Sequence, residues 1–454
     1  MEINDNILFV NSIIDDAIKK NSSDIHIEPF EENVRIRFRI NGSLVEYKTV
    51  DKSMHSKIIT RIKIMSELDI AEKRLPQDGR ITYTYENSKI DLRISIINTI
   101  HGQKCVIRIL NPESFKIGMQ NLGISENEQK MIEGFTKFEN GMVLICGPTG
   151  SGKTTTLYTM LEQENTIDKN IITIENPVEY NIFGINQIQI NEKIGLRFDN
   201  TLKFVLRQDP SVIMVGEIRD LETSKLAIRA SITGHKVYST IHTDDCYQSI
   251  IRLMDMGIED YMIRASLKVV IAQRLVRKLC PHCKKKVTPT SEQMEIFRSN
   301  GLNPTEIYEP GNCDECSLGY DGRMAVIQIL KIDDDLRSLI KKDMNLKSLK
   351  NYGEENNIDS LFKKALIQVA LGNTSFDEAM RLYNEDWQFA KRRQCIKKRN
   401  KLQSFQEKTV FVFETIFNSF ECEDSNHRNN QSTQGTKRIQ TIETQLGQSF
   451  WEFE

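Results

Sequence analysis

The sequence predicts an α/β protein with a parallel-sheet core, a smaller α+β N-terminal domain, a cysteine-rich insert and C-terminal helices. Three observations predict this class. Short continuous apolar runs alternate with helical patterns in the central region, apolar and polar residues alternate in the first hundred residues, and two cysteine pairs follow. Continuous apolar runs are typical of parallel strands covered on both faces, whereas alternation is typical of strands with one exposed face.

The N-terminal domain begins with a predicted helix over 5–20, where apolar residues recur at helical spacing. The segments 24–28 and 34–40 alternate as half-buried strands do. Asn41-Gly42 is a strong signal for a hairpin turn. A second helix is expected over 54–69, and further strands are expected at 80–85, 89–96 and 104–110.

The central strands are four apolar runs separated by helical segments. They span residues 142–146, 171–174, 212–215 and 237–240. This order of elements predicts a parallel sheet covered by helices on both faces.

The first of these strands leads into a match to the phosphate-binding pattern GxxxxGK[ST]. The residues expected to bind nucleotide are Gly147, Pro148, Thr149, Gly150, Ser151, Gly152, Lys153, Thr154 and Thr155. Glycines let successive backbone N–H groups face phosphate oxygens. Lys153 is expected between the β- and γ-phosphates, and the Thr154 hydroxyl on Mg²⁺. The pattern, between a strand and a helix, predicts binding of ATP and Mg²⁺.

Two further residues follow the ends of central strands. Glu217 comes after an apolar strand and a glycine, where a carboxylate can orient or deprotonate the attacking water. The alternative role for Glu217 is to cap the next helix. His242 follows the strand 237–240, at the edge where open α/β sheets bind ligands. A lone histidine is more often structural, so residue type alone does not assign it a function.

The four paired cysteines predict a structural Zn²⁺ site. Cys280 and Cys283 form one CxxC pair, and Cys313 and Cys316 form the other. Four thiolates complete a tetrahedral site, and the intervening segment has room for a small helix. The alternative is a redox-active dithiol, which a single CxxC would favour more than two do.

Together, several stretches resemble the secretion ATPases that power type II secretion, type IV pilus assembly and competence pili. The resemblance covers about residues 5–383. It is carried by the phosphate-binding loop and by the motifs at 23–29, 68–80, 173–179, 206–220, 233–235 and 239–243.

The resemblance implies a RecA-like P-loop core and a PAS-like N-terminal domain. It assigns roles as follows: Glu175 in the Asp box, Glu217 as the catalytic glutamate, His242 in the His box, and Arg80 and Arg93 as arginines that neutralise γ-phosphate charge. The alternative for Arg93 is a surface charge on a strand. Asn176 departs from the family, which usually has Asp there.

The resemblance also implies partners. Family members form hexameric rings and act on a platform protein of the inner membrane, which handles pilin or pseudopilin. The tetracysteine motif occurs in assembly and secretion members and favours extension over pilus retraction. Because the resemblance starts near residue 5, we expect docking to differ from members that carry an additional N-terminal domain.

Charge and composition limit the alternatives. Lys plus Arg is 61 and Asp plus Glu is 63, for a net charge of −2. This balance disfavours direct nucleic-acid binding, although a DNA- or RNA-translocating motor of a conjugation or uptake system stays the main alternative. An ABC-type subunit is disfavoured because no LSGGQ-like signature occurs, and a non-enzymatic nucleotide-binding scaffold is a further alternative.

The sequence also predicts a compartment. The acidic N-terminus is unlike a secretory signal, and no apolar run reaches the ~18 residues of a membrane helix. Nine cysteines without a disulfide-like spacing indicate a reducing compartment. We expect a cytoplasmic protein that associates with the inner membrane through protein partners.

These patterns predict six segments. They are an N-terminal α+β domain at 1–111, a linker at 112–137, a P-loop ATPase core at 138–279, a tetracysteine zinc module at 280–330, C-terminal helices at 331–384, and a polar and basic tail at 385–454 that is expected to be poorly ordered.

Overall fold

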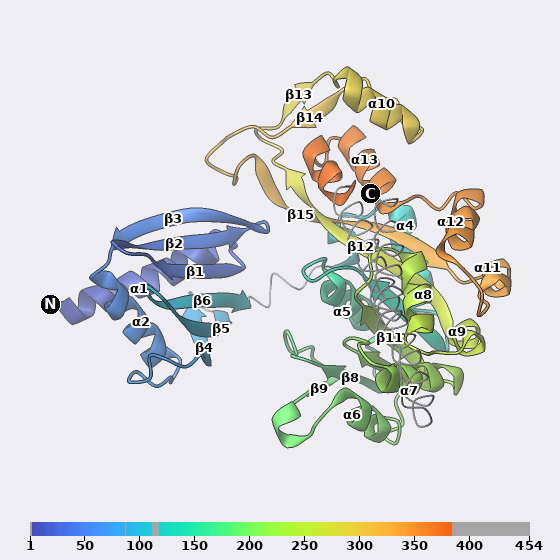
Figure 1. The fold of residues 1–454 in the computed structure, drawn as a ribbon, viewed down its shortest axis with the longest axis horizontal. Coiled ribbons are helices and arrows are strands. Elements are labelled where there is room, and N and C mark those ends of the chain that lie inside the picture. The colour runs from blue at the N-terminus through green and yellow to red at the C-terminus, as the bar shows by residue number, and fades with distance from the viewer. Residues whose placement is uncertain (1, 87, 111–117, 384–454) are drawn as a thin grey trace, which may run out of the picture. The chain divides into compact units, whose positions relative to one another are not determined.

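The computed structural model describes residues 2–86, 88–110 and 118–383 (Figure 1). It contains an antiparallel sheet with helices followed by a mainly parallel sheet, which confirms the predicted fold class. The tail at 385–454 lies outside the described residues, so its expected lack of order stays a prediction. The six segment boundaries likewise stay predictions.

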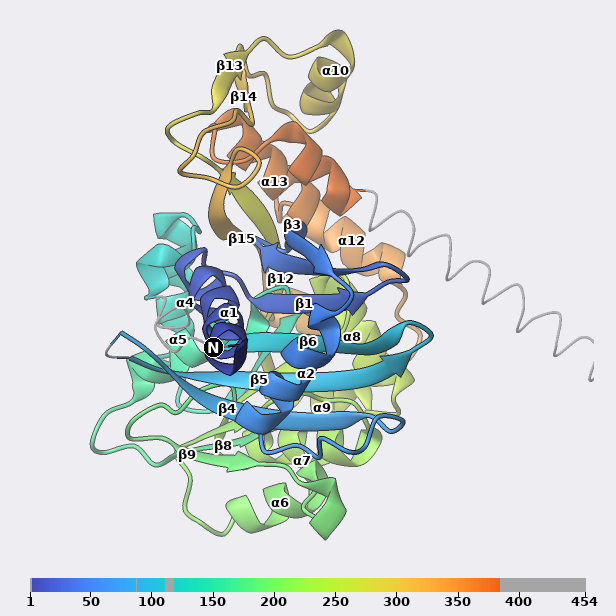
Figure 2. The ribbon, with the colours of Figure 1, turned by 90° about the vertical axis from the view of Figure 1, so that its left-hand side faces the viewer.

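The N-terminal sheet has six strands in the order β3-β2-β1-β6-β5-β4, and every neighbouring pair is antiparallel. The strands are β1 (Asp24–Pro29), β2 (Asn33–Ile40), β3 (Ser43–Asp51), β4 (Gln77–Tyr85), β5 (Ser88–Thr99) and β6 (Gly102–Leu110). Helices α1 (Glu2–Lys19) and α2 (Met54–Met65) lie on one face of this sheet (Figure 2).

The alternating sequence of these strands separates an apolar face from a polar face. Ile25 and Ile27 of β1 are fully buried in one cluster with Ile14 of α1. The predicted hairpin turn is confirmed, because Asn41 and Gly42 have φ angles of 50° and 85° and connect the paired strands β2 and β3. Two consecutive positive φ angles are what a tight turn matched to the strand twist requires.

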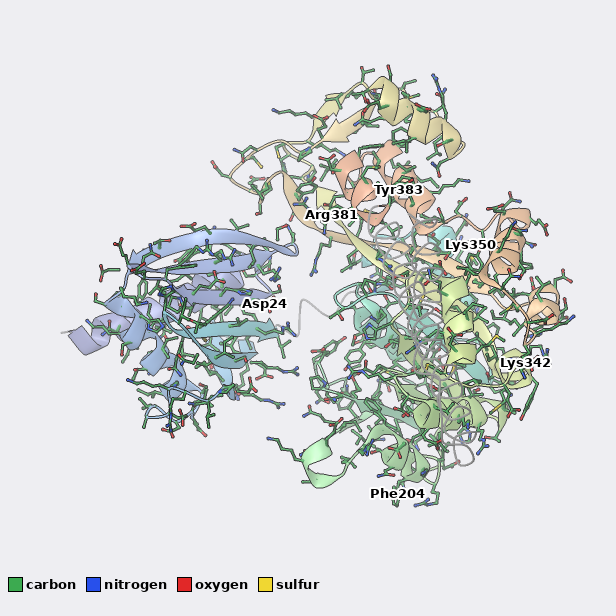
Figure 3. The ribbon with its side chains drawn as sticks, viewed as in Figure 1. Asp24, Phe204, Lys342, Lys350, Arg381 and Tyr383 are labelled. Atoms are coloured by element: carbon green, nitrogen blue, oxygen red, sulfur yellow. The ribbon has the colours of Figure 1, made fainter. Side chains whose placement is uncertain are left out.

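The opposite face of the sheet carries buried charge. Glu28 accepts hydrogen bonds from Arg37 Nε and Nη2 at 2.8 and 2.9 Å and from Lys104 Nζ at 2.9 Å. Asp24, labelled in Figure 3, pairs with Arg39 and Arg108 at 3.4 and 3.1 Å. Each buried carboxylate is therefore compensated by cations from the strands beside β1, as burial of a charge requires.

We predict that the Glu28 cluster makes stability depend on acid. Burial favours a higher pKa for Glu28, but hydrogen bonds from Arg37 and Lys104 outweigh it and lower the pKa to about 2 from 4.5. The stabilisation is therefore full above pH 4.5 and is lost as the pH falls toward about 2. Because the cations around Glu28 are partly exposed and solvent screens them, the shift corresponds to at most about 3 kcal/mol.

Hydrogen exchange of the β1 and β2 amides against pH measures this loss. Glu28→Gln should give weakened protection at neutral pH and a flatter acid profile, whereas the exposed neighbour Glu31→Gln should match the wild type. An unchanged acid profile in Glu28→Gln would contradict the assignment.

The second sheet has seven strands in the order β15-β12-β7-β11-β10-β8-β9, and β15 alone among them runs antiparallel to its neighbour. The strands are β7 (Gly141–Cys146), β8 (Ile171–Glu175), β9 (Asn186–Gln189), β10 (Val212–Val215), β11 (Lys236–Ile241), β12 (Leu267–Leu279) and β15 (Tyr320–Lys331). The four predicted apolar strands are confirmed, whereas β9, β12 and β15 were not predicted.

Helices and apolar clusters cover both faces of this sheet. The short helices η1 (Met119–Asn121) and η2 (Glu192–Ile194) accompany α4 (Glu126–Phe135), α5 (Lys153–Glu164), α6 (Phe198–Val205), α7 (Leu221–Ile232), α8 (Cys246–Asp255) and α9 (Asp260–Ser266). Residues of β7 alternate between the two clusters: Met142 and Leu144 face one, and Val143 and Ile145 face the other. The continuous apolar run of β7 thus follows from burial on both sides.

The cysteine pairs lie in an arm that leaves the sheet after β12 and returns at β15. Its elements are β13 (Lys285–Val287), α10 (Ser291–Ser299) and β14 (Ile307–Glu309). The chain then continues through α11 (Asp334–Leu339), α12 (Leu346–Glu355) and α13 (Leu361–Ala370). In Figures 1 and 2 the arm lies beyond the ends of β12 and β15, next to α13.

Candidate nucleotide and metal sites

The predicted phosphate-binding residues, Glu217 and His242 emerge at one edge of the core sheet. Strands β7, β11 and β10 are parallel neighbours, and their carboxyl ends lie side by side. Gly147 directly follows β7, and His242 directly follows β11. Parallel strands bring residues that are far apart in sequence to a common edge, which is where open α/β sheets bind ligands.

The loop after β7 has the backbone conformation that phosphate binding requires. Gly152, at the N-terminus of α5, has a φ of 85°. Gly147 has a φ of 151° and no room for a side chain, because a Cβ there would lie 2.6 Å from Ser151 Oγ. The buried Ser151 hydroxyl has no hydrogen-bond partner within the described residues. These features fit a site that leaves donors available for phosphate oxygens.

Lys153 supplies the positive charge of this loop. Its side chain is only 8% exposed, and Nζ donates to the carbonyls of Gly147 and Pro148 at 2.8 and 2.9 Å. Burial lowers the pKa of Lys153 to about 8, although the negative charge of Glu217 opposes this shift. The ammonium group is thus held over the loop, where a bound phosphate would favour its charged form.

Glu217 and His242 lie close together at this edge of the sheet. His242 Nε2 is 3.4 Å from Glu217 Oε2, and Arg219 Nε is 2.6 Å from the same oxygen. Burial and the nearby charge of Lys153 lower the pKa of His242. A neutral histidine can donate a hydrogen bond from Nε2–H to the Glu217 carboxylate without adding a positive charge beside it.

Glu175 occupies a different environment, although it also ends a strand. Its carboxylate is buried and accepts hydrogen bonds from Tyr158, from Thr173 Oγ1 at 2.6 Å and from Gln187 Nε2 at 3.2 Å. Burial raises the pKa of Glu175 despite these hydrogen bonds. Through Tyr158, the carboxylate is tied to α5, the helix that begins with Lys153.

The predicted arginines lie opposite one another on the N-terminal sheet. Arg80 of β4 and Arg93 of β5 are register partners, and Arg80 is exposed. Arg93 Nη2 donates to the Val178 carbonyl at 2.7 Å, and Nη1 lies 3.7 Å from Glu179. Arg93 therefore contacts the segment that follows Glu175.

Sequence reasoning missed several residues around the loop. Arg219 lies in the motif at 206–220, but its spacing does not indicate that it pairs with Glu217. Gln273 and Arg274 lie on β12, and the two polar residues interrupt the apolar pattern by which a strand is recognised. Tyr158 lies in a helix where its hydroxyl gave no local signal.

The four paired cysteines converge in the arm. Their Sγ atoms all lie within 4.8 Å of one another. Separations of 3.8 Å for Cys280–Cys313, 3.6 Å for Cys283–Cys316 and 3.5 Å for Cys313–Cys316 are close to the edges of a ZnS₄ tetrahedron. With Zn–S bonds of about 2.3 Å, those edges are about 3.8 Å. The cluster therefore fits a tetrahedral Zn²⁺ ion.

The base of the arm is bonded to the C-terminal segment. The Leu279 amide donates to the Asn373 carbonyl at 2.9 Å, and Lys284 Nζ donates to the Gly372 carbonyl at 2.8 Å. Arg277 pairs with the buried Glu378 at 2.8 Å. The cysteine cluster therefore lies next to the end of β12 and the segment 372–378 that follows α13.

Residues 4–381 match the family described as "Type II/IV secretion system protein". The chain belongs to this family. The chain is 42% identical over 377 residues to the putative type II secretion system protein E of Escherichia coli, covering 83% of this chain and 76% of that protein.

Two further relatives carry ATPase in their names. Identity is 40% over 380 residues to the type II secretion system ATPase E of Vibrio cholerae, covering 84% of this chain and 75% of that protein. It is 42% over 377 residues to the type IV pilus assembly ATPase PilB of Pseudomonas aeruginosa, covering 82% and 67%. The family resemblance drawn from the motifs is therefore confirmed.

Solved structures share the fold of this family member. The Legionella pneumophila ATPase DotB superposes with a TM-score of 0.60 at 19% identity, covering 83% of this chain and 96% of that one. The pilus retraction motor PilT with bound ADP gives a TM-score of 0.56 at 23% identity, covering 82% and 95%. Among the described residues, no helix is both long enough and apolar enough to cross a membrane.

We predict that Cys313→Ser releases the metal without affecting the phosphate-binding loop. Loss of one of four thiolates should lower zinc content well below one ion per chain, because the closed site requires all four ligands. Metal analysis of purified protein measures this. The buried Cys105, on β6, provides the matched control, since Cys105→Ser leaves the cluster intact. Full zinc in Cys313→Ser would show that the metal assignment is wrong.

Proposed function

We propose that this chain is the ATP-hydrolysing motor of a machine that assembles a pilus or pseudopilus. The observation that carries the proposal is the convergence of Lys153, Glu217 and His242 at one sheet edge, in a chain that belongs to the secretion ATPase family. Relatives named type II secretion ATPase E and type IV pilus assembly ATPase PilB support the choice of process.

ATP binding would use the loop after β7. The backbone amides at the start of α5 and the Ser151 hydroxyl are available to phosphate oxygens, and Lys153 provides the neutralising charge. The Thr154 hydroxyl would hold Mg²⁺, which on binding neutralises the developing phosphate charge. Thr154 is half-exposed in the first turn of α5, which supports this role.

Glu217 would position and activate the attacking water. In the structure its carboxylate is shared by Arg219 and His242. Release of Arg219 would free the Glu217 carboxylate to contact the attacking water. His242 would hold Glu217 in place, and its contact with Glu217 would change when Arg219 is released.

The remaining predicted residues would act around this centre. We infer that Arg80 and Arg93 supply charge toward the γ-phosphate when the two sheets close on a nucleotide. Glu175 would act as a positioning residue, because its buried carboxylate is occupied by Tyr158 and Thr173. The Zn²⁺ ion held by Cys280, Cys283, Cys313 and Cys316 would stabilise the arm.

Glu217→Gln tests the catalytic assignment. Removing the base should lower ATP turnover by about 10²-fold or more while leaving MgATP binding intact, because the amide keeps the shape but accepts no proton. Phosphate release and nucleotide affinity are measured on the same protein. Glu222→Gln is the matched control, since Glu222 is exposed in the first turn of α7. Equal turnover in the two variants would contradict the proposal and favour a non-enzymatic scaffold.

The proposed partners are other copies of the chain and a platform protein of the inner membrane, with pilin or pseudopilin handled indirectly. We expect native mass spectrometry with a non-hydrolysable ATP analogue to give six copies. Capture from native membranes should recover the platform protein, and added DNA or RNA should leave ATP turnover unchanged. Stimulation by nucleic acid would instead favour a nucleic-acid-translocating motor.

A further inference from the structure

Gln273 of β12 contacts the phosphate-binding loop from the strand next to it. Its side chain is 1% exposed, and both of its polar atoms are bonded to that loop or to the helix that follows. Nε2 donates to the Ser151 carbonyl at 3.0 Å, and Oε1 accepts from the Thr156 hydroxyl at 2.8 Å. These two bonds lie on either side of the residues that carry the phosphate-binding groups, from Gly152 to Thr155.

The same residue also limits the space around the loop glycines. A Cβ at Gly147 would lie 2.5 Å from the Gln273 carbonyl oxygen, and a Cβ at Gly152 would lie 2.8 Å from Gln273 Nε2. Both separations are shorter than the non-bonded contacts that Cβ atoms make in proteins. The loop therefore packs directly against Gln273, and Gly147 and Gly152 permit this close approach.

The side-chain amide of Gln273 is buried in a sheet of mainly apolar residues. Placing it there is unfavourable unless its donor and acceptor are both satisfied, whereas an apolar side chain of the same size would carry no such cost. Here both ends of Gln273 are satisfied by the phosphate-binding segment. The polar groups of Gln273 thus serve this contact.

We propose that Gln273 is a positioning residue that holds the loop in the conformation that receives nucleotide phosphates. The inference rests on the proposed function, because it assumes that ATP binds at this loop. Gln273 itself does not touch the nucleotide. It fixes the Ser151 carbonyl and the first turns of α5, so that the amides and Lys153 are oriented before the ligand arrives.

The matched control is a second buried glutamine on the neighbouring strand. Gln328 of β15 is 3% exposed, and its side chain is bonded to the Cys246 amide and the Asp359 carbonyl at 3.5 and 3.3 Å. It is therefore as buried as Gln273 and is satisfied by groups outside the loop. Methionine at either position keeps the length of the side chain and removes its hydrogen bonds.

The experiment compares Gln273→Met with Gln328→Met in the zinc-loaded full chain. Affinity for MgADP is measured by fluorescence of a labelled nucleotide, and the Tm is measured without nucleotide. We expect Kd to rise by about tenfold or more in Gln273→Met and to stay near wild type in Gln328→Met. The decrease in Tm should be similar in the two variants, because each loses two buried hydrogen bonds. A purely structural role for Gln273 would lower Tm and leave Kd unchanged.

A second pair of variants keeps the test decisive if Gln273→Met does not fold. Thr156→Val removes the hydroxyl bonded to Gln273 Oε1, and Thr156→Ser retains a hydroxyl at that position. Thr156→Val should weaken MgADP binding, and Thr156→Ser should restore it. Equal affinities within this pair, or within the glutamine pair, would overturn the inference. If the wild type itself bound no MgADP, the proposed function would fail as well.

Discussion

A buried ammonium group is the constraint on which the core of this protein depends. The side chain of Lys153 is buried, and its burial disfavours the charged form. Two loop carbonyls and the negative charge of Glu217 offset the penalty. The parallel arrangement of β7, β11 and β10 is what brings these groups to one edge, so the order of strands is inseparable from the electrostatics of the site.

Two buried carboxylates, Glu164 and Glu28, are likewise compensated by groups of opposite charge. Glu164, at the end of α5, is bonded to Lys236 and Lys169 at 2.8 and 2.9 Å and to the hydroxyl of Tyr238. Glu28 has an equivalent set of cations in the N-terminal sheet. Each cluster joins elements from distant parts of the sequence, and removal of one cation weakens the compensation of the buried carboxylate.

The sequence predicted the parts of the structure that local patterns specify. The phosphate-binding loop, the four apolar strands and the hairpin at Asn41-Gly42 each have a pattern that few other structures share. β12 was missed because Gln273 and Arg274 interrupt its apolar run, and their buried partners come from other elements. The burial of Glu175 could not be predicted either, because its hydrogen-bond partners Tyr158 and Gln187 contact it only in the folded chain.

The length of β12 has a consequence of its own. β12 carries the chain from Gln273, at the loop after β7, to Leu279, and Cys280, the first cysteine of the metal cluster, follows directly. At about 3.3 Å per residue, Gln273 and Cys280 are roughly 23 Å apart along the chain. The pairing of β12 with β15 is irregular between Arg277 and Leu279. In the regularly paired part, from Gln273 to Arg277, inserting or deleting one residue would turn the following side chains of the strand to the opposite face. The number of residues in this regular part therefore matters to the fold independently of which residues they are.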